Sequence, residues 1–356
     1  MHVRTVLAVL GALTTSLCVG SGLASPTPAA PTVPAVIDLH VDLPYALHHG
    51  KHAIDDASSP THPDRLVRGG AGTLVLPMFV LDAHAMSPAA VRREYDAVFA
   101  TVDRAMRSSA ARGLLSSPGE PESAGHVATL LSFEGADGFA DDPDAIIPWI
   151  RRGACFVGLV HARTNALAGS STDPSRKRRT GLTDKGRTLA QVVVEHGGLL
   201  DAAHASDAAV DDMVAIARQH GAPVVVTHTG MRSLRATERN ASDDVAAKVA
   251  STGGVVGIDI HSGHVARPGS IASIGDVVAH IEHAVRVAGI DHVAIGSDLD
   301  GGIQVPTGAD GAAFWPVLLE ALASRGWNGE QIDALFRGNA SRVIRWSRAH
   351  GCAAGR

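Results

Sequence analysis

The chain has 356 residues, of which 45% are hydrophobic and 19% are charged, a composition typical of a folded globular protein. Its formal net charge of -5 and its aromatic content of 4% argue against nucleic-acid binding, which needs a basic face and aromatic side chains for stacking. The length suits one large α/β barrel, so chemistry on a small molecule is the favoured class of function.

Residues 1–24 have the pattern of a cleaved secretory signal peptide, with an early Arg4, an apolar run and small residues around Ala24. The polar residues 14–16 interrupt that run, which is also short for a membrane span. We therefore expect cleavage near Ala24 and secretion, without a stable membrane anchor. A proline-rich leader, residues 25–34, follows the signal.

From residue 35 onward, short runs rich in Val, Ile and Leu alternate with longer amphipathic segments, which is typical of a parallel sheet covered by helices. The pattern favours a single (β/α)8 TIM barrel over residues 35–348 and a flexible tail over 349–356, with a doubly wound open sheet as the main alternative. The expected strands are 35–42, 71–80, 127–134, 154–160, 199–204, 223–228, 255–260 and 292–298. The expected helices are 87–113, 144–153, 182–198, 206–221, 242–254, 273–289, 315–326 and 328–344.

Two cysteines, Cys155 and Cys352, remain after removal of the signal peptide. A disulfide between them is one option in an oxidising compartment. Because Cys155 lies in an apolar strand-like run, a buried and unpaired cysteine is the favoured interpretation.

The stretch "VIDLHVDLP" places Asp38, His40 and Asp42 at alternate positions of the first strand, so the three side chains share one face. In a barrel, chemistry belongs at the carboxyl ends of the strands. One polar residue at such an end is usually a cap or a satisfied core group, but several together supply the nitrogen and oxygen donors that zinc and similar ions prefer. Seven such residues follow six of the strands: His40, Asp42, Glu134, His161, His204, His228 and Asp298.

Other histidines and Asp38 have competing interpretations. Asp38 could orient a metal ligand or be a buried structural group, and the two options weigh about equally. Residues 48–52, together with His280 and His283, are expected at the solvated surface. His261, at the end of the seventh strand, is a serious competitor as a ligand.

The residues in this order resemble the membrane (renal) dipeptidase family, the M19 metallopeptidases of the amidohydrolase superfamily, over residues 35–345. The resemblance rests on motifs rather than on single residues. These are His-x-Asp in "IDLHVDLP", the Glu of "SFEGADG", the His of "GLVHARTN", Asp-x-x-His in "LDAAHAS", the His of "VVVTHTG", the Arg of "ATERNASDD", "IGSDLDGG" and "RGNASRV".

The resemblance implies a metal-dependent hydrolase barrel that holds two zinc ions. His40 and Asp42 would bind one ion, His204 and His228 would bind the other, and Glu134 would bridge them. A water shared by two such ions has a pKa lowered towards about 7, so hydroxide is available as the nucleophile.

The resemblance also implies roles toward a dipeptide substrate. His161 would contact the substrate carbonyl or the oxyanion, Arg239 would bind the terminal carboxylate, and Asp298 would transfer protons. Without the resemblance, Arg239 would be interpreted as a surface residue, and His261 has no role in the family pattern. The family further implies a homodimer.

The leading hypothesis is therefore a secreted zinc dipeptidase that uses a metal-bridging hydroxide. The alternative is another binuclear metal hydrolase acting on N-acyl amino acids, lactones or β-lactams. A non-catalytic metal-binding or adhesion protein is disfavoured, because a structural site needs no proton-transferring carboxylate such as Asp298. Leu299 stands where the family usually has Phe, and Val160 stands where it has Thr, so side-chain preference stays open.

Overall fold

The structure is a computed structural model that describes residues 35–108, 113–116, 126–175 and 180–353. The expected signal peptide and the proline-rich leader lie outside the described residues. So do the basic residues 176–179 and the last three residues of the expected tail.

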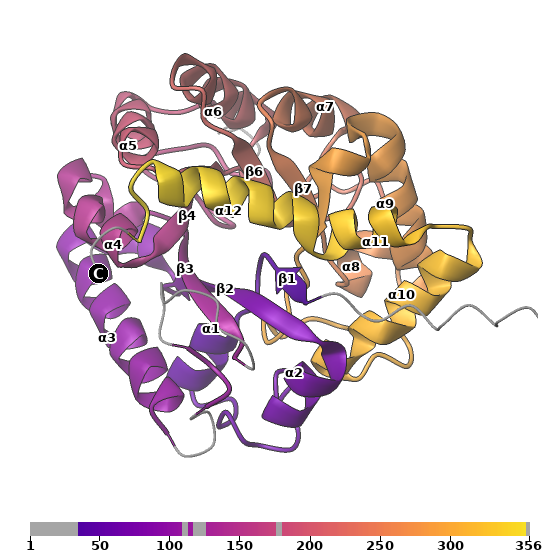
Figure 1. The fold of residues 1–356 in the computed structure, drawn as a ribbon. Helices are drawn as coiled ribbons and strands as arrows, with labels where there is room; N and C mark the ends of the chain where they lie inside the picture. Colours follow the sequence, from indigo (N-terminus) through magenta and orange to yellow (C-terminus); the bar gives the residue numbers. More distant parts are fainter. Residues whose placement is uncertain (1–34, 109–112, 117–125, 176–179, 354–356) are drawn as a thin grey trace, which may run out of the picture. The chain divides into compact units, whose positions relative to one another are not determined.

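In the described part of the chain, eight parallel strands form a closed barrel in sequential order, and β1 pairs with β8 through Asp38 and Ile295. This closure confirms the predicted (β/α)8 barrel and excludes the open sheet. Figure 1 shows the strands at the centre and helices around them. The strands are β1 (Val36–Asp38), β2 (Ala71–Phe79), β3 (Ala128–Glu134), β4 (Ala154–Gly158), β5 (Leu199–Asp201), β6 (Val224–Thr229), β7 (Val255–Ile258) and β8 (Val293–Ile295).

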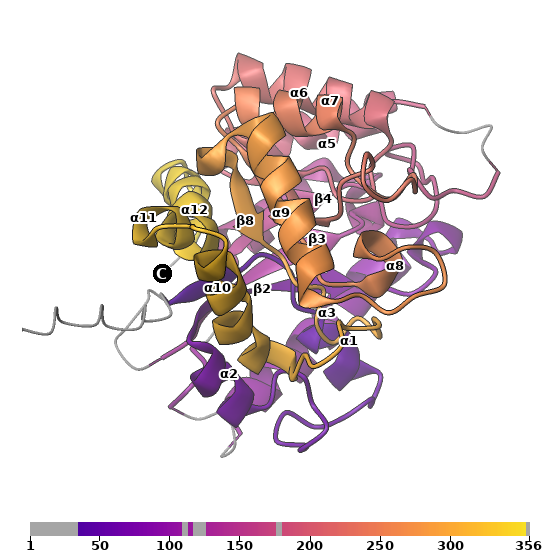
Figure 2. The same ribbon diagram turned by 90° about the vertical axis from the view of Figure 1, so that its right-hand side faces the viewer.

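The long helices begin where the sequence predicts, because their first turns are capped by hydroxyl side chains. Ser87, Thr183, Ser206, Ser242 and Ser273 each accept a backbone N–H of the following turn. Figure 2 shows α9 and α10 beside each other on the outside of the barrel. The helices of four residues or more that the sequence predicts are α3 (Pro88–Met106), α4 (Ile147–Arg152), α5 (Asp184–Glu195), α6 (Asp207–Gln219), α7 (Asp243–Ser251), α9 (Ile274–Ala288), α10 (Trp315–Ser324), α11 (Gly329–Asp333) and α12 (Asn339–Ala349).

The sequence does not predict three short helices that lie in loops: α1 (Leu43–His48), α2 (Pro63–Gly69) and α8 (Ser262–Val265). They are too short to show a helical period of apolar residues. The single-turn helices are η1 (Ala83–Ala85), η2 (Asp137–Phe139), η3 (Pro143–Ile146), η4 (Ile290–His292) and η5 (Gly311–Phe314), and the π-helical η6 (Ala334–Gly338) joins α11 to α12.

An aromatic cluster fixes the carboxyl end of β3. The ring of Tyr95 on α3 lies 4.8 Å from that of Phe133, and Phe133 lies 5.0 Å from Phe139. The buried Tyr95 hydroxyl donates a hydrogen bond of 2.8 Å to the carbonyl of Gly135. The residue before that glycine is Glu134, so this packing holds one of the predicted ligands in place.

Helix α12 crosses the amino-terminal end of the barrel (Figure 1), opposite the predicted site. Its Asn339 amide donates to the carbonyl of Val293 at the start of β8, over 2.8 Å. Further along, Arg342 donates to the carbonyl of Gly253 just before β7, and Ser347 donates to that of Gly197 just before β5. The side chains of the helix therefore hold the backbone at the starts of β8, β7 and β5 at this end of the barrel.

Cys155 on β4 and Cys352 after α12 form a disulfide, with their Cα atoms 5.6 Å apart and a separation of 197 positions in sequence. The favoured interpretation of Cys155 as an unpaired cysteine was therefore wrong. Cys352 belongs to residues 349–356, which were expected to form a flexible tail, but it is buried. The expectation is therefore wrong for the residues up to Ala353. The disulfide fastens the end of the chain beneath the barrel.

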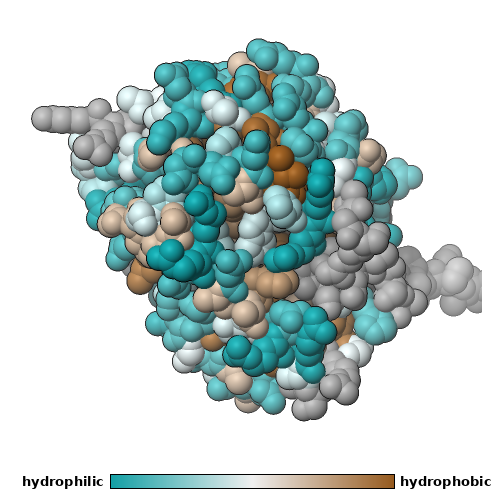
Figure 3. Space-filling model, turned by 90° about the vertical axis from the view of Figure 1, so that its left-hand side faces the viewer, coloured by the Kyte–Doolittle hydropathy of each residue, from teal (hydrophilic) through white to brown (hydrophobic). Residues whose placement is uncertain are grey.

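Within the described residues, no helix is both long and apolar enough to cross a bilayer. Figure 3 shows one face of the molecule as mostly hydrophilic, with small separate hydrophobic groups.

Loss of the disulfide should lower stability without disturbing the site at the other end of the barrel. Closing so long a loop typically contributes about 2–4 kcal/mol to the free energy of unfolding. We expect a C155A/C352A variant to lose that amount of free energy of unfolding. It should therefore unfold at a lower temperature and a lower denaturant concentration, with unchanged metal content. The control is wild type reduced with a phosphine, which should match the variant. Equal stability of oxidised and reduced wild type would contradict the assignment.

Candidate metal centre and substrate pocket

The polar side chains predicted at the strand ends converge around one oxygen atom. Oε1 of Glu134, the last residue of β3, lies 3.0 Å from Nε2 of His204 and 3.5 Å from Nε2 of His228. The same oxygen lies 3.6 Å from Nε2 of His40 and 3.8 Å from Nε2 of His161. Four imidazoles from four different strand ends thus surround one carboxylate, as the sequence predicts.

The donors form three overlapping groups in which one ligand atom per residue lies within 4.8 Å of the others. Glu134 belongs to two of the groups and His40 also belongs to two, which is compatible with more than one cation in a shared cluster. The groups are His40, Glu134 and His228; Glu134, His161 and His204; and His40, Asp42 and Asp298. Asp298 therefore lies next to the cluster and beside Asp42.

Hydrogen bonds determine which nitrogen of His228 carries the proton. The Thr227 hydroxyl donates to Oδ2 of the buried Asp201 over 2.7 Å. The same hydroxyl lies 3.0 Å from Nδ1 of His228, so its oxygen accepts the Nδ1 proton. Nε2 of His228 consequently presents a lone pair to the centre of the site.

His204 presents a lone pair to the same point. Nη2 of Arg239 lies 3.2 Å from Nε2 of His204, and because an arginine can only donate, this nitrogen is the acceptor. The two Nε2 atoms of His204 and His228 lie 3.2 Å apart. Two lone pairs and the carboxylate of Glu134 therefore face each other, which is a favourable arrangement once a cation lies between them.

Several buried polar atoms of the cluster lack hydrogen-bond partners among the described residues. Both ring nitrogens of His40, Oδ1 of Asp42 and Nδ1 of His204 are in this state. A buried polar atom without a partner costs about 1–3 kcal/mol. These imidazole nitrogens and this carboxylate oxygen are atoms of the kind that bind zinc. The residues present therefore fit the metal that the sequence predicts.

The pKa values of the clustered histidines are shifted by burial and by the charges of their neighbours. Burial and the nearby Arg239 hold the pKa of His204 well below its usual value, and burial and His40 do the same for His228. Neutral imidazoles of this kind are ready to bind a cation. Burial also lowers the pKa of His40, but the carboxylates of Glu134 and Asp42 overcome this effect and raise it to about 10.

Burial and the charge of Asp42 raise the pKa of Asp298 well above its usual value. Two carboxylates this close need a proton or a cation between them. The backbone is also strained here, because Asp298 and His204 adopt left-handed φ angles of 64°, which non-glycine residues rarely do. The strain lies at two of the predicted site residues.

The segment after Asp298 is tied down by contacts that the sequence does not predict. Asp300 accepts hydrogen bonds of 2.5 Å from the Thr61 hydroxyl and 2.9 Å from Nε2 of His52. His52 is therefore not a solvated residue, as residues 48–52 were expected to be. Asp298 itself is joined to β1, since its N–H donates to the carbonyl of His40 over 3.0 Å.

Beneath the cluster lie three buried carboxylates that share one local motif. Oδ1 of Asp38 accepts the N–H of His40 (3.2 Å) and of Ser297 (2.8 Å), and Asp201 and Asp259 accept the N–H two residues further along in the same way. Asp38 thus contacts the backbone of His40 and not its ring. Asp201 is the Asp of the Asp-x-x-His motif in "LDAAHAS". Asp259 was missed as a site residue, although "IDIH" repeats the Asp-x-His signal that "IDLH" carries at Asp38.

A cavity of about 650 Å³ opens above the cluster. Arg239 lines it and is 7% exposed, so it is not the surface residue that its sequence context alone suggests. His261 also lines the cavity, but it lies outside the three candidate metal groups. His161 is the most open of the predicted histidines, with 34% of its side chain exposed.

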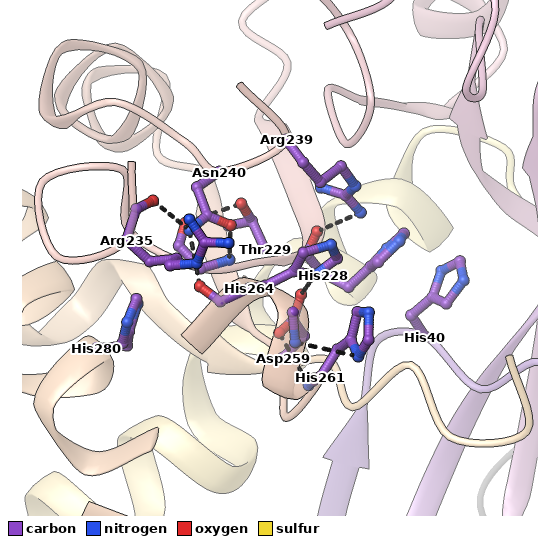
Figure 4. A network of polar contacts seen from close by, with 12 residues as sticks. His40, His228, Thr229, Arg235, Arg239, Asn240, Asp259, His261, His264 and His280 are labelled. Carbon is purple, nitrogen blue, oxygen red and sulfur yellow. Dashed lines mark hydrogen bonds and ion pairs between the residues drawn. The ribbon is translucent and has the colours of Figure 1, made fainter. Parts of the chain in front are cut away.

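Figure 4 shows Arg239, His228 and Asp259 near this cavity and His280 further away. His280 is buried and its Nδ1 accepts the N–H of Met231 over 2.8 Å, so the expected surface position was wrong. The helix α9 that carries it packs this face against the loop after β6, and a histidine replaces an apolar residue there because it can satisfy that N–H.

Comparison with known proteins places the chain among peptidases. Residues 32–351 match the model of the family described as membrane dipeptidase, peptidase family M19. Dipeptidase ataJ of Aspergillus terreus is 30% identical over 243 residues, which cover 62% of this chain and 58% of that protein. Dipeptidase 3 of Macaca fascicularis is 26% identical over 320 residues, covering 87% of this chain and 64% of that protein. The chain thus matches less than two thirds of the length of these relatives.

Solved structures share the fold. The probable dipeptidase PvdM from Pseudomonas aeruginosa superposes with a TM-score of 0.78 at 19% identity, covering 88% of this chain and 96% of that one. A metallo peptidase from Rhodobacter sphaeroides, liganded with a phosphinate mimic of L-Ala-D-Ala, superposes with a TM-score of 0.74 at 21% identity, covering 89% of this chain and 100% of that one.

Removal of the central carboxylate should abolish tight metal binding. We expect E134A and H228A to lose more than about 100-fold in zinc affinity, because loss of a direct ligand exceeds the 10- to 100-fold effect typical of a supporting group. Elemental analysis and competition with a chromophoric chelator measure this. The control is H283A, since His283 pairs with Asp243 outside the site. Wild-type zinc content in E134A would refute the cluster.

Proposed function

The chain belongs to the membrane dipeptidase family, peptidase family M19, and we propose that it is a zinc-dependent dipeptidase that hydrolyses the single peptide bond of a dipeptide. The convergence of Nε2 of His204, Nε2 of His228 and Oε1 of Glu134 carries the proposal. Three electron-pair donors in a buried site that opens into a cavity are suited to metal-assisted hydrolysis.

Five residues would hold two zinc ions. His40 and Asp42 would hold one, His204 and His228 would hold the other, and Glu134 would be shared by both sets, since its Oε1 lies within 3.6 Å of a nitrogen of each. When bound, zinc polarises a carbonyl and lowers the pKa of water to about 7. The orphaned atoms of His40 and Asp42 support this assignment.

His161 and Asp298 would act on the reacting atoms. His161 is partly open to the cavity and its ring lies 4.3 Å from that of His204, so its Nε2–H can donate to the carbonyl oxygen as negative charge develops there. Asp298 lines the same cavity beside Asp42. Its carboxylate takes a proton from the attacking water and passes it to the nitrogen of the leaving amine.

Arg239 would select substrates that have a free carboxyl terminus. Its Nη2 is used by the carbonyl of His228 (3.1 Å) and by His204. The other guanidinium donors make no hydrogen bond to the described residues and remain available to a carboxylate, which a planar guanidinium binds in a bidentate manner. The cavity of about 650 Å³ has the size of a small-ligand site, which suits a dipeptide.

Export from the cytoplasm belongs to the same proposal. Residues 1–24 have the signal-peptide pattern, and the Cys155–Cys352 disulfide is of the kind that persists in oxidising compartments. Expression of the full chain in a host with a general secretion pathway should give a secreted protein whose N-terminus, by mass spectrometry, lies near residue 25. A secreted or cell-bound protein that keeps residue 1 would contradict cleavage.

The activity can be tested with the purified zinc-loaded protein. We expect hydrolysis of dipeptides that is lost on chelation and restored by zinc, with little hydrolysis of tripeptides. N-acyl amino acids, lactones and β-lactams are the matched comparison, because they share the carbonyl chemistry without the free amine. Cleavage of one of these in place of dipeptides would move the assignment to the alternative hydrolase.

Two substitutions separate proton transfer from substrate binding. D298N should reduce kcat by about 10²- to 10⁴-fold, the usual contribution of a positioned acid–base group, while zinc content and KM change little. R239K should mainly raise KM for dipeptides, because lysine cannot form the bidentate contact. Elemental analysis of both variants is the control. An unchanged kcat in D298N would remove Asp298 from the mechanism.

A further inference from the structure

The substrate cavity has two unlike ends, one on each side of the metal-binding cluster. At one end the rings of Tyr45 and Phe79 lie 5.8 Å apart, and Phe79 lies 4.7 Å from the ring of His161. Further along the cavity, the ring of His204 lies 4.3 Å from that of His161. Nη2 of Arg239 lies 3.2 Å from Nε2 of His204. An aromatic end therefore faces an end that carries a fixed positive charge.

The charged end holds a second ionic pair that the proposed mechanism does not use. Oδ2 of Asp259 lies 2.7 Å from Nδ1 of His264, and Oδ1 accepts the N–H of His261. The Asp259 side chain is completely buried. Burial raises the pKa of Asp259, but the charge and hydrogen bond of His264 lower it below its usual value. A buried carboxylate in this position requires hydrogen-bond partners, and His264 is the side chain that touches its Oδ2.

His264 is oriented so that its free nitrogen faces the cavity. Nδ1 is held by the buried Asp259, and the residue lines the cavity with 16% of its side chain exposed. Its Nε2 makes no hydrogen bond to another of the described residues. The ring of His261 lies 4.6 Å from that of His264 and restricts its movement.

The spacing between His264 and Arg239 is fixed by their neighbours (Figure 4). The side-chain amide of Asn240, next to Arg239 in sequence, donates to the carbonyl of His264 over 2.8 Å. Oδ1 of Asn240 accepts the N–H of Gly230 at the end of β6. The Arg239 guanidinium and the His264 ring thus belong to one rigid end of the cavity, with the Asp259 carboxylate behind His264.

We propose that His264, held by Asp259, binds a second carboxylate, so that the enzyme prefers dipeptides whose C-terminal residue is aspartate or glutamate. The inference rests on the proposed function, in which Arg239 binds the terminal carboxylate of the same residue. The side chain of that residue then lies at the Arg239 end, where a carboxylate can accept a hydrogen bond from Nε2 of His264. A glutamine or asparagine amide has the same shape but lacks the negative charge that strengthens such a hydrogen bond.

The test compares side chains of equal shape and different charge. Calorimetry on the zinc-loaded protein measures binding of glutamate and of glutamine, each as the L and the D enantiomer. We expect glutamate to bind about tenfold or more tightly than glutamine in at least one series, as is typical of a charge-assisted hydrogen bond. H264Q should reduce this ratio to about one, whereas H261Q, the matched cavity histidine, should keep it.

Kinetics on Ala-Glu and Ala-Gln give the second readout, as the ratio of kcat/KM in wild type, H264Q and H261Q. Dipeptide hydrolysis without a preference for Ala-Glu would overturn the inference and leave the proposed function intact. Selective binding of glutamate that depends on His264, without hydrolysis of any dipeptide, would support the inference and contradict the proposed function. A preference for glutamate that survives in H264Q would also overturn it, and the wild-type ratios decide the matter even if H264Q fails to fold.

Discussion

The crowding of electron-pair donors around Oε1 of Glu134 is the constraint on which the rest of this structure depends. The hydrogen bonds of Thr227 and Arg239 leave both Nε2 atoms of His204 and His228 as acceptors, 3.2 Å apart and facing a carboxylate. Such an arrangement is unfavourable by itself and becomes favourable around positive charge. The hydrogen-bond network therefore favours binding of a cation at this point.

The barrel tolerates this unfavourable arrangement because it separates the site from the elements that stabilise the fold. The donors lie at the carboxyl ends of the strands, whereas α12 and the Cys155–Cys352 disulfide close the amino ends. The strained backbone of His204 and Asp298 is supported locally, by the contacts of the Asp298 segment with β1 and with the loop that carries Thr61. Strain at the site can then persist because the surrounding structure fixes it.

The sequence predicts the strands of the barrel and the convergence of polar side chains at their carboxyl ends because both depend on local rules. Side chains alternate along a strand, and parallel strands end on the same face, so His40 and His228 can be placed together without any knowledge of their distance. The disulfide and the position of His280 depend on which distant segments meet, and no local pattern carries that information. Cys155 and Cys352 are 197 residues apart, and His280 is buried by a loop 49 residues earlier in the chain.

The same Asp-x-His motif serves two purposes in this barrel, and the difference lies in the second carboxylate oxygen. On β1, Oδ1 of Asp38 accepts backbone N–H groups while its Oδ2 has no hydrogen-bond partner among the described residues, and the following His40 points to the metal cluster. Directly after β7, Asp259 repeats the backbone contact, but its Oδ2 binds His264 on α8. A motif that places a ring in the metal-binding cluster at one strand end thus places a ring in the cavity wall at another. The cluster is formed at the strand ends, and the loop that follows β7 contributes His261 and His264 to the cavity wall.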